Sequence, residues 1–140
     1  MTRIGIITQA RMTSSRLPGK VLIPAGGRSM LDHHIDRLSS ADLPVVLATT
    51  TNAADDPLAD LGHRRGIEVF RGSEDDVLSR FAGAASSAGL DVVVRVTSDC
   101  PLIDAALISD GVRRFVELDD PHAVSYTHSE PTRQEAISYA

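Results

Sequence analysis

Short hydrophobic runs alternate along the chain with segments whose hydrophobic residues recur at helical spacing. The runs at 4–7, 45–48, 67–70 and 92–96 are predominantly apolar, which is typical of parallel strands buried on both faces. The segments between them place apolar residues three or four positions apart, and this spacing predicts helices that pack on the sheet. The order predicts an α/β fold with three layers, a mainly parallel sheet and right-handed crossovers. The expected inner helical positions are Met30, Leu31, Ile35 and Leu38, then Leu58 and Leu61, then Val77, Leu78, Phe81 and Ala85, and finally Leu107, Ile108, Val112, Phe115 and Val116.

Capping residues mark the starts of three predicted helices. Ser29 stands three residues before Asp32, which is the spacing of a capping box. Asp56 and Pro57 match the preferences of an N-cap and of the first helical position. Asp104 is the expected N-cap of the last helix.

The chain length of 140 residues fits one domain. Residues 123–126 are predicted to form a last strand, and the sequence after them is polar and weakly patterned. We therefore expect an α/β domain over residues 1–128 and a polar tail over 129–140, to which the pattern assigns no structure.

Charge and composition exclude several classes of protein. A net charge of -5 and a pI near 5.4 argue against the broad basic face that nucleic acids need. Cys100 is the single cysteine, so an internal disulfide is excluded, and we expect it to be a small packing residue. No apolar run approaches the roughly 18 residues of a membrane span. We expect a cytoplasmic protein that binds neither nucleic acid nor membrane.

A loop with three cations, residues 8–20, follows the first predicted strand. Arg11, Arg16 and Lys20 supply positive charge, and Ser14 adds a hydroxyl donor. Guanidinium and ammonium groups match phosphate oxygens well, and ligands of open α/β sheets bind at strand ends. A solvated basic loop without a ligand is the alternative. A valine after the glycine-lysine pair rules out a Walker A motif.

Acidic residues follow two later strands. Asp99 comes after the strand at 92–96, where a carboxylate is suited to a hard cation such as Mg²⁺ bound together with substrate phosphates; a helix-capping role is the alternative. The acids at 74–76 stand where a helix is predicted to begin, a place that the helix dipole favours for acids. His33 and His34 are adjacent and point about 100° apart on a helix, so we expect exposed or packed histidines and not a chelating pair.

Three segments, in order along the chain, carry a family resemblance. The first is Gln9-Ala10-Arg11 with Arg16-Leu17-Pro18-Gly19-Lys20, the second is 72–78, and the third is 97–104, where Ser98 replaces a glycine of the family pattern. Together they resemble the sugar nucleotidyltransferases that make CMP-activated acid sugars. The resemblance is closer to the spore coat polysaccharide biosynthesis cytidylyltransferase group, and it spans about residues 3 to 126.

The resemblance implies an activity. It implies a Rossmann-like fold of the nucleotide-diphospho-sugar transferase type and the transfer of CMP from CTP to a sugar or acid sugar, with release of pyrophosphate, for cell-surface polysaccharide biosynthesis. Mg²⁺ is the implied cofactor, CTP and the sugar are the implied partners, and a homodimer is compatible with it. The alternative is a nucleotide-binding module, or a truncated homologue, without turnover.

The resemblance also assigns roles to individual residues. Arg11, Arg16 and Lys20 would hold the triphosphate and stabilise the departing pyrophosphate, and Asp99 would hold Mg²⁺ against the α-phosphate. Ala48 and Thr49 would border the base. The other implied nucleotide contacts are Gln9, Ala10, Ser14, Ser73 and Asp76.

Enzymes of this family continue beyond the last matched strand into a segment that carries a second metal carboxylate. No such segment can be matched onto residues 129–140, where Glu130 and Glu135 are the only acids. We therefore expect this chain to bind CTP and Mg²⁺ but to turn over sugar slowly or not at all by itself.

Overall fold

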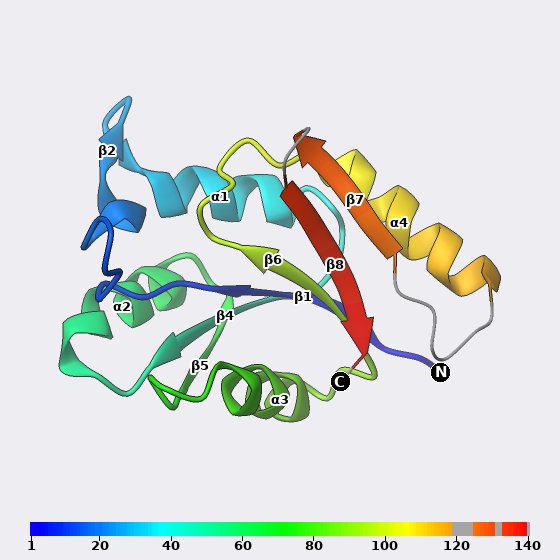
Figure 1. Ribbon diagram of the computed structural model, residues 1–140, viewed down its shortest axis with the longest axis horizontal. Helices are drawn as coiled ribbons and strands as arrows, with labels where there is room; N and C mark the ends of the chain where they lie inside the picture. The colour runs from blue at the N-terminus through cyan, green and yellow to red at the C-terminus, as the bar shows by residue number, and fades with distance from the viewer. Residues whose placement is uncertain (119–124, 131–132, 140) are drawn as a thin grey trace.

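The computed structural model describes residues 1–118, 125–130 and 133–139, with side chains described for residues 1–118. Within these ranges, six strands form one sheet in the order β5-β4-β1-β6-β8-β7 (Figure 1). The first four strands of that order run parallel, and β8 and β7 join antiparallel. The strands are β1 (Ile4–Gln9), β4 (Val45–Thr50), β5 (Glu68–Gly72), β6 (Val92–Thr97), β7 (Ser125–Glu130) and β8 (Arg133–Tyr139).

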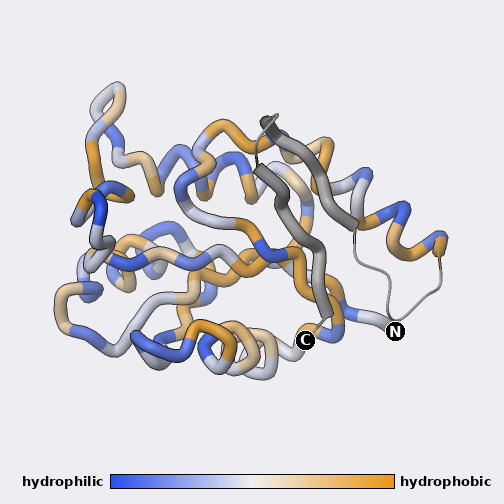
Figure 2. Tube along the Cα trace, in the orientation of Figure 1, coloured by the Kyte–Doolittle hydropathy of each residue, from blue (hydrophilic) through white to orange (hydrophobic). Residues whose placement is uncertain are grey.

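In the part of the chain that the structure describes, four α-helices cover the two faces of this sheet: α1 (Met30–Ser39), α2 (Asp56–Arg64), α3 (Val77–Ala88) and α4 (Ala105–Leu118). On one face, Ile6 packs in one cluster with α1 and α4, and Leu47 of β4 packs in another with α1 and α2. On the other face, Ile7 packs with the alanines of α3. Figure 2 shows hydrophobic positions concentrated along the central strands. The predicted three-layer α/β fold with a mainly parallel sheet is therefore confirmed.

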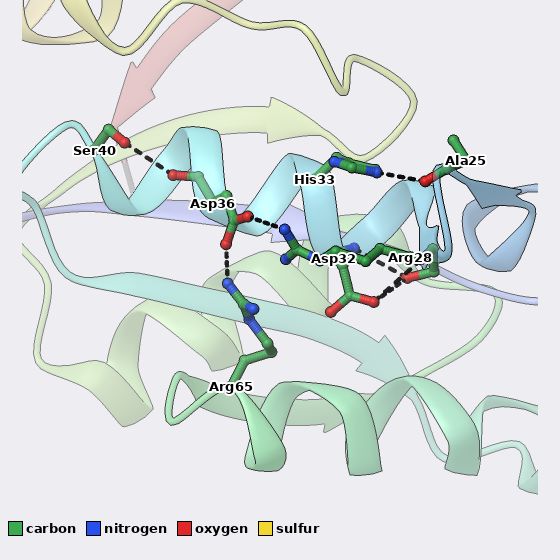
Figure 3. A network of polar contacts seen from close by, with 8 residues as sticks. Ala25, Arg28, Asp32, His33, Asp36, Ser40 and Arg65 are labelled. Carbon is green, nitrogen blue, oxygen red and sulfur yellow. Dashed lines mark hydrogen bonds and ion pairs between the residues drawn. The ribbon is translucent and has the colours of Figure 1, made fainter.

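A small antiparallel hairpin, β2 (Pro24–Ala25) and β3 (Arg28–Ser29), joins the cationic loop to α1. The predicted capping box at the start of α1 is present, because Ser29 Oγ accepts from the Asp32 N–H at 3.0 Å and the Asp32 carboxylate accepts from the Ser29 N–H. His33 Nε2 donates to the Ala25 carbonyl at 2.8 Å. These bonds hold the hairpin against the first turn of α1 (Figure 3).

Asp36 extends the same network to two further elements. Its carboxylate pairs with Arg28 of the hairpin at 2.7 Å and with Arg65, which follows α2 (Figure 3). The two guanidinium groups lower the pKa of Asp36, chiefly through the hydrogen bond from Arg28. All three side chains are partly exposed, so solvent screening keeps the contribution of these pairs to stability small.

Three predicted inner helical positions are wrong. Leu78, Leu107 and Val116 are 79%, 46% and 57% exposed. Adjacent helical residues point about 100° apart, and Leu107 and Val116 each stand next to a residue that packs inward. In α4, Ile108 and Phe115 are the buried neighbours.

Several predicted boundaries also move. The helix α2 begins at Asp56, and Asp55 is its N-cap, because a short 3-10 turn over Ala53–Asp55 leads into it. The strand predicted at 67–70 is β5, which is paired along its length with β4. The strand predicted at 123–126 is β7, which begins at Ser125, while 123 and 124 lie outside the described residues. The strand β8 was not predicted at all.

Candidate functional site

A polar cavity of about 380 Å³ opens where β1 and β6 end. Both strands run parallel, so the loops that follow them leave the sheet at the same edge, where ligands of such folds bind. The cavity brings together the cations and Asp99 that the sequence singled out. Its lining residues are Gln9, Ala10, Arg11, Ser14, Arg16, Lys20, Val21, Thr97, Ser98 and Asp99.

Four other predicted site residues are not in that lining. Ala48 and Thr49 are completely buried within β4, and the Thr49 hydroxyl has no hydrogen-bond partner among the described residues. Ser73 and Asp76 stand at the start of α3, where Ser73 Oγ accepts from the Asp76 N–H and Asp76 caps the helix by accepting from the Ser79 N–H. These four residues therefore lie outside the cavity lining, although Ala48 pairs with Gln9 in the sheet and Arg80 bonds both Gln9 and the Ser73 carbonyl.

A second hollow, of about 610 Å³, lies between α1 and the segment after β6. Its walls include His33 and Arg37 of α1 on one side and Pro101 and Leu102 on the other. None of the predicted site residues lines this second hollow. The smaller cavity is therefore the candidate functional site.

Lys20 and Asp99 form an ion pair across the cavity, with Lys20 Nζ 3.1 Å from Asp99 Oδ2. Their side chains are 37% and 29% exposed, and pairs this exposed contribute about 0 to 1 kcal/mol. A phosphate oxygen could take the place of Asp99 beside the ammonium group, and a cation could take the place of Lys20 beside the carboxylate. The pair therefore joins the two groups expected to bind opposite charges of one ligand.

Asp99 suits Mg²⁺ as a partial binding site. Among the described residues, no cluster of three or more His, Cys, Asp or Glu side chains could enclose a metal ion. Mg²⁺ commonly takes only one or two protein carboxylates and completes its shell with waters and substrate phosphates. Asp99 beside a loop with three cations meets that minimum requirement.

The backbone of the cationic loop is fixed by hydrogen bonds that the sequence did not reveal. Gly19 has a φ of 69°, a left-handed conformation that glycine adopts without strain, and its N–H donates to the Met12 carbonyl at 2.9 Å. The Met12 N–H in turn donates to Asp55 Oδ1 at 2.7 Å. The loop therefore closes on itself and is tied to the segment between β4 and α2.

Asp55 is the buried anchor of this arrangement. It is fully buried and also accepts from the Thr50 hydroxyl. A buried carboxylate is costly unless its oxygens are hydrogen-bonded, and both oxygens are. From the sequence we predict only that a helix starts at this point. The burial of Asp55 could not be predicted, because nothing in the local sequence distinguishes it from Asp56.

Glu74 provides a second tie to the loop. One carboxylate oxygen accepts from the Thr13 hydroxyl at 2.7 Å and the other from the Asn52 amide at 2.9 Å. The bond from Asn52, followed by the bond from Thr13, lowers the pKa of Glu74. Glu74 is thus a connector between three loops, and it precedes α3 instead of lying in its first turn.

Arg80 of α3 contacts the site although the sequence pattern did not predict it. It is 2% exposed, and Nη2 donates to Gln9 Oε1 at 2.6 Å. Nη1 donates to the carbonyls of Ser73 and, at 3.3 Å, of Glu74. Burial lowers the pKa of Arg80, and the nearby charge of Arg11 lowers it further. The only signal in the sequence is an arginine among the small residues of the inner face of α3.

His34 links β1 to the segment that carries Asp99. It is fully buried, with Nδ1 3.0 Å from the Cys100 carbonyl and Nε2 2.9 Å from Thr8 Oγ1. Because a carbonyl only accepts, Nδ1 carries the hydrogen and the neutral ring accepts from Thr8. Burial lowers the pKa of His34, which agrees with that neutral form. Both ring nitrogens are engaged, as expected for a packed histidine.

The profile of a family described as cytidylyltransferase matches residues 4–138. The chain belongs to the cytidylyltransferase family. The family resemblance inferred from the three sequence segments is therefore confirmed.

Two curated relatives match this chain over most of its length. The spore coat polysaccharide biosynthesis protein SpsF of Bacillus subtilis is 39% identical over 114 residues, which cover 77% of this chain and 48% of that protein. The 3-deoxy-manno-octulosonate cytidylyltransferase of Geobacter sulfurreducens is 32% identical over 116 residues, which cover 81% and 46%. The chain spans about half the length of these curated relatives.

A comparison with solved structures identifies the fold of the chain. A cytidylyltransferase from Leptospira borgpetersenii matches 99% of this chain and 61% of its own with a TM-score of 0.92 and 32% identity. The fold is that of the nucleotide-diphospho-sugar transferases. Within the described residues of this chain, no helix has both the length and the hydrophobicity to cross a membrane.

Proposed function

We propose that the chain binds CTP and transfers CMP to a sugar or acid sugar, with release of pyrophosphate, as a step of cell-surface polysaccharide biosynthesis. The observation that carries the proposal is the cavity in which Arg11, Arg16, Lys20 and Asp99 meet, in a member of the cytidylyltransferase family. Three cations around one cavity suit a triphosphate, and a carboxylate among them suits the metal ion that accompanies it.

In the proposed reaction, an oxygen of the sugar attacks the α-phosphorus of CTP. A new oxygen–phosphorus bond forms to the sugar, and the proton of the attacking hydroxyl passes to the surrounding water. The bond between the α-phosphorus and the bridging oxygen breaks, and pyrophosphate leaves with that electron pair. Reactions of this type depend on positioning and charge neutralisation. Arg11, Arg16 and Lys20 would orient the triphosphate and stabilise the negative charge that gathers on the pyrophosphate.

Asp99 would hold Mg²⁺ at the cavity. When bound, the ion would polarise the phosphate oxygens and neutralise part of their charge. Lys20 would exchange its contact with Asp99 for one with a phosphate oxygen. Ala10 and Ser14, which also line the cavity, would complete the contacts to the nucleotide.

A second candidate is nucleotide binding without turnover. Among the described residues, Asp99 is the single carboxylate in the cavity lining. Sites that catalyse phosphoryl transfer with two carboxylates hold their metal ions with more negative charge than this. A site with this one carboxylate would bind the nucleotide but hold its metal ions less firmly. We expect turnover to be slow for that reason.

A thermal-shift panel of the four common nucleoside triphosphates, with and without Mg²⁺, tests the binding step, because a ligand that binds the native state raises its melting temperature. The expected result is a larger shift with CTP than with UTP, ATP or GTP, and a further increase with Mg²⁺. A pyrophosphate-release assay with a panel of sugars and acid sugars then separates turnover from binding alone. The absence of any shift with CTP would remove the proposal.

A further inference from the structure

A buried arginine stands directly behind the cavity. Arg80 is 2% exposed, and among the described residues it makes its hydrogen bonds to the Gln9 side chain and to the backbone carbonyls of Ser73 and Glu74. Its Nε is buried with no hydrogen-bond partner in that part of the chain. Gln9 itself lines the cavity.

This placement is costly for folding. Burying a charge is unfavourable unless it is paired and hydrogen-bonded, and the oxygen atoms that accept hydrogen bonds from Arg80 among the described residues are neutral. The carboxylates of Asp55, Glu74 and Asp76 act on the guanidinium without a hydrogen bond and offset part of the cost. The nearby Arg11 adds repulsion, which lowers the pKa of Arg80 further. Unsatisfied buried polar groups are uncommon in native proteins and often have a functional explanation.

The contact with Arg80 decides which way the Gln9 carboxamide points. A guanidinium group only donates, so the atom that faces Arg80 at 2.6 Å is Oε1. The amide nitrogen, with its two hydrogens, is then the remaining polar group of a side chain that lines the cavity. Among the described residues, no partner of that nitrogen is found.

We propose that Arg80 is a positioning residue that holds the Gln9 carboxamide with its NH₂ group toward the nucleotide, where it donates to an acceptor atom of the base or of a phosphate. The inference rests on the proposed function, since it concerns the binding of CTP. A positive charge behind Oε1 also polarises the amide, and this strengthens the hydrogen bond that the NH₂ group donates.

A purely structural role for Arg80 would be to brace the start of α3. The bonds from Nη1 to Ser73 and Glu74 serve that purpose. They do not account for Nη2, which reaches across to β1 and bonds to a residue of the cavity wall. The two roles therefore use different nitrogen atoms, and variants of Gln9 separate them.

The test is a double-mutant cycle in which the affinity for CTP and Mg²⁺ is measured by calorimetric titration. The variants are Gln9→Met, Arg80→Met and the combination of both. We expect each single variant to weaken binding by about tenfold or more, the loss of a hydrogen bond that involves a charged ligand. We expect the double variant to bind about as weakly as Gln9→Met, because Arg80 acts through Gln9.

Arg95→Met is the matched control for the loss of one positive charge. Arg95 is exposed on β6 and stacks on Phe81 of α3, 4.8 Å from the ring centroid, and it does not line the cavity. We expect its affinity for CTP to equal that of the wild type. Titration with inorganic triphosphate identifies the acceptor, because a weakened affinity of Gln9→Met for triphosphate indicates a phosphate oxygen, and a loss seen with CTP alone indicates the base.

Gln9→Glu keeps the proposal testable if Arg80→Met fails to fold. A glutamate retains an acceptor for Arg80 and gives the buried guanidinium a carboxylate partner, so we expect this variant to resist urea at least as well as the wild type. It presents no donor to the cavity, so we expect it to lose affinity for CTP.

The outcomes separate the two proposals. If the wild-type chain binds neither CTP nor triphosphate, the proposed function fails and the role of Arg80 fails with it. If the wild type binds CTP and the Gln9 and Arg80 variants bind equally well, or if the losses in the cycle simply add, the positioning role alone is overturned.

Discussion

The buried carboxylate of Asp55 gives the sharpest prediction about how the cationic loop is held. Asp55 accepts from the Met12 N–H at 2.7 Å and from the Thr50 hydroxyl. In Asp55→Ala both donors lose their acceptor, because the methyl group that replaces the carboxylate accepts no hydrogen bond. We expect the variant to be less stable and its loop to be less ordered.

The size of the effect follows from burial. Leaving a buried donor unsatisfied costs about 1 to 3 kcal/mol, and the Thr50 hydroxyl can rotate to limit its share. The alanine variant also no longer buries a charge, and this gain offsets part of the loss from the two unsatisfied donors. We therefore expect the free energy of unfolding to fall by about 2 to 4 kcal/mol. For a chain of this length that corresponds to a drop in melting temperature of roughly 7 to 14 °C.

Urea unfolding followed by circular dichroism measures the change, and a nearby residue supplies the control. Asp60 is exposed in α2, so we expect Asp60→Ala to change stability by less than about 0.5 kcal/mol. Asp55→Asn keeps one oxygen acceptor and should fall between the two. A free energy of unfolding for Asp55→Ala within 0.5 kcal/mol of the wild type would refute the assignment of Asp55 as an anchor of the loop.

Three further predictions concern the cavity and its surroundings. Lys20→Ala and Arg16→Ala should each weaken CTP binding by about 10- to 100-fold in calorimetry, the equivalent of about 1.5 to 3 kcal/mol for a charge-assisted bond, with little change in melting temperature. Asp99→Asn should keep the fold but remove the Mg²⁺ dependence of stabilisation by CTP in thermal shifts. Because burial lowers the pKa of His34 below its ordinary 6.5, the unfolded chain binds more protons, so stability should be fully present above pH 6.5 and fall below it. In urea titrations at pH 7.5 and 5.5, His34→Gln should lose less stability on acidification than the wild type.

Local patterns were enough to predict the layers of the fold and to bring the cationic loop and Asp99 to the same edge of the sheet. The strands at 4–7 and 92–96 are predominantly apolar, so their parallel pairing could be expected. Parallel neighbours end at one edge of the sheet, and for this reason Lys20 and Asp99 could be expected together although 79 positions separate them. These inferences need only the period of the hydrophobic pattern and the direction of the strands.

The contacts that hold the loop could not be predicted in this way. Asp55, Glu74 and Arg80 each bond to the first strand or its loop from a distant segment, and such bonds depend on the exact approach of one loop to another. A helical pattern says that position 80 lies on α3, but not that its guanidinium reaches β1. The strand β8 was not predicted for another reason. Its sequence is largely polar and lacks the apolar run that marks a central strand.

The two kinds of contact have different consequences for ligand binding. On the side of β4 and α3, buried or part-buried bonds to Asp55 and from Arg80 fix the loop and Gln9 before any ligand arrives. On the side of β6, the loop meets Asp99 through a partly exposed ion pair worth about 0 to 1 kcal/mol. In the proposed function, a nucleotide with its cation would therefore replace the weak contact while the strong ones stay in place. Binding to a site that is already ordered loses less conformational entropy, so variants that loosen the loop, such as Asp55→Ala, should weaken CTP binding even though Asp55 is not in the lining of the cavity.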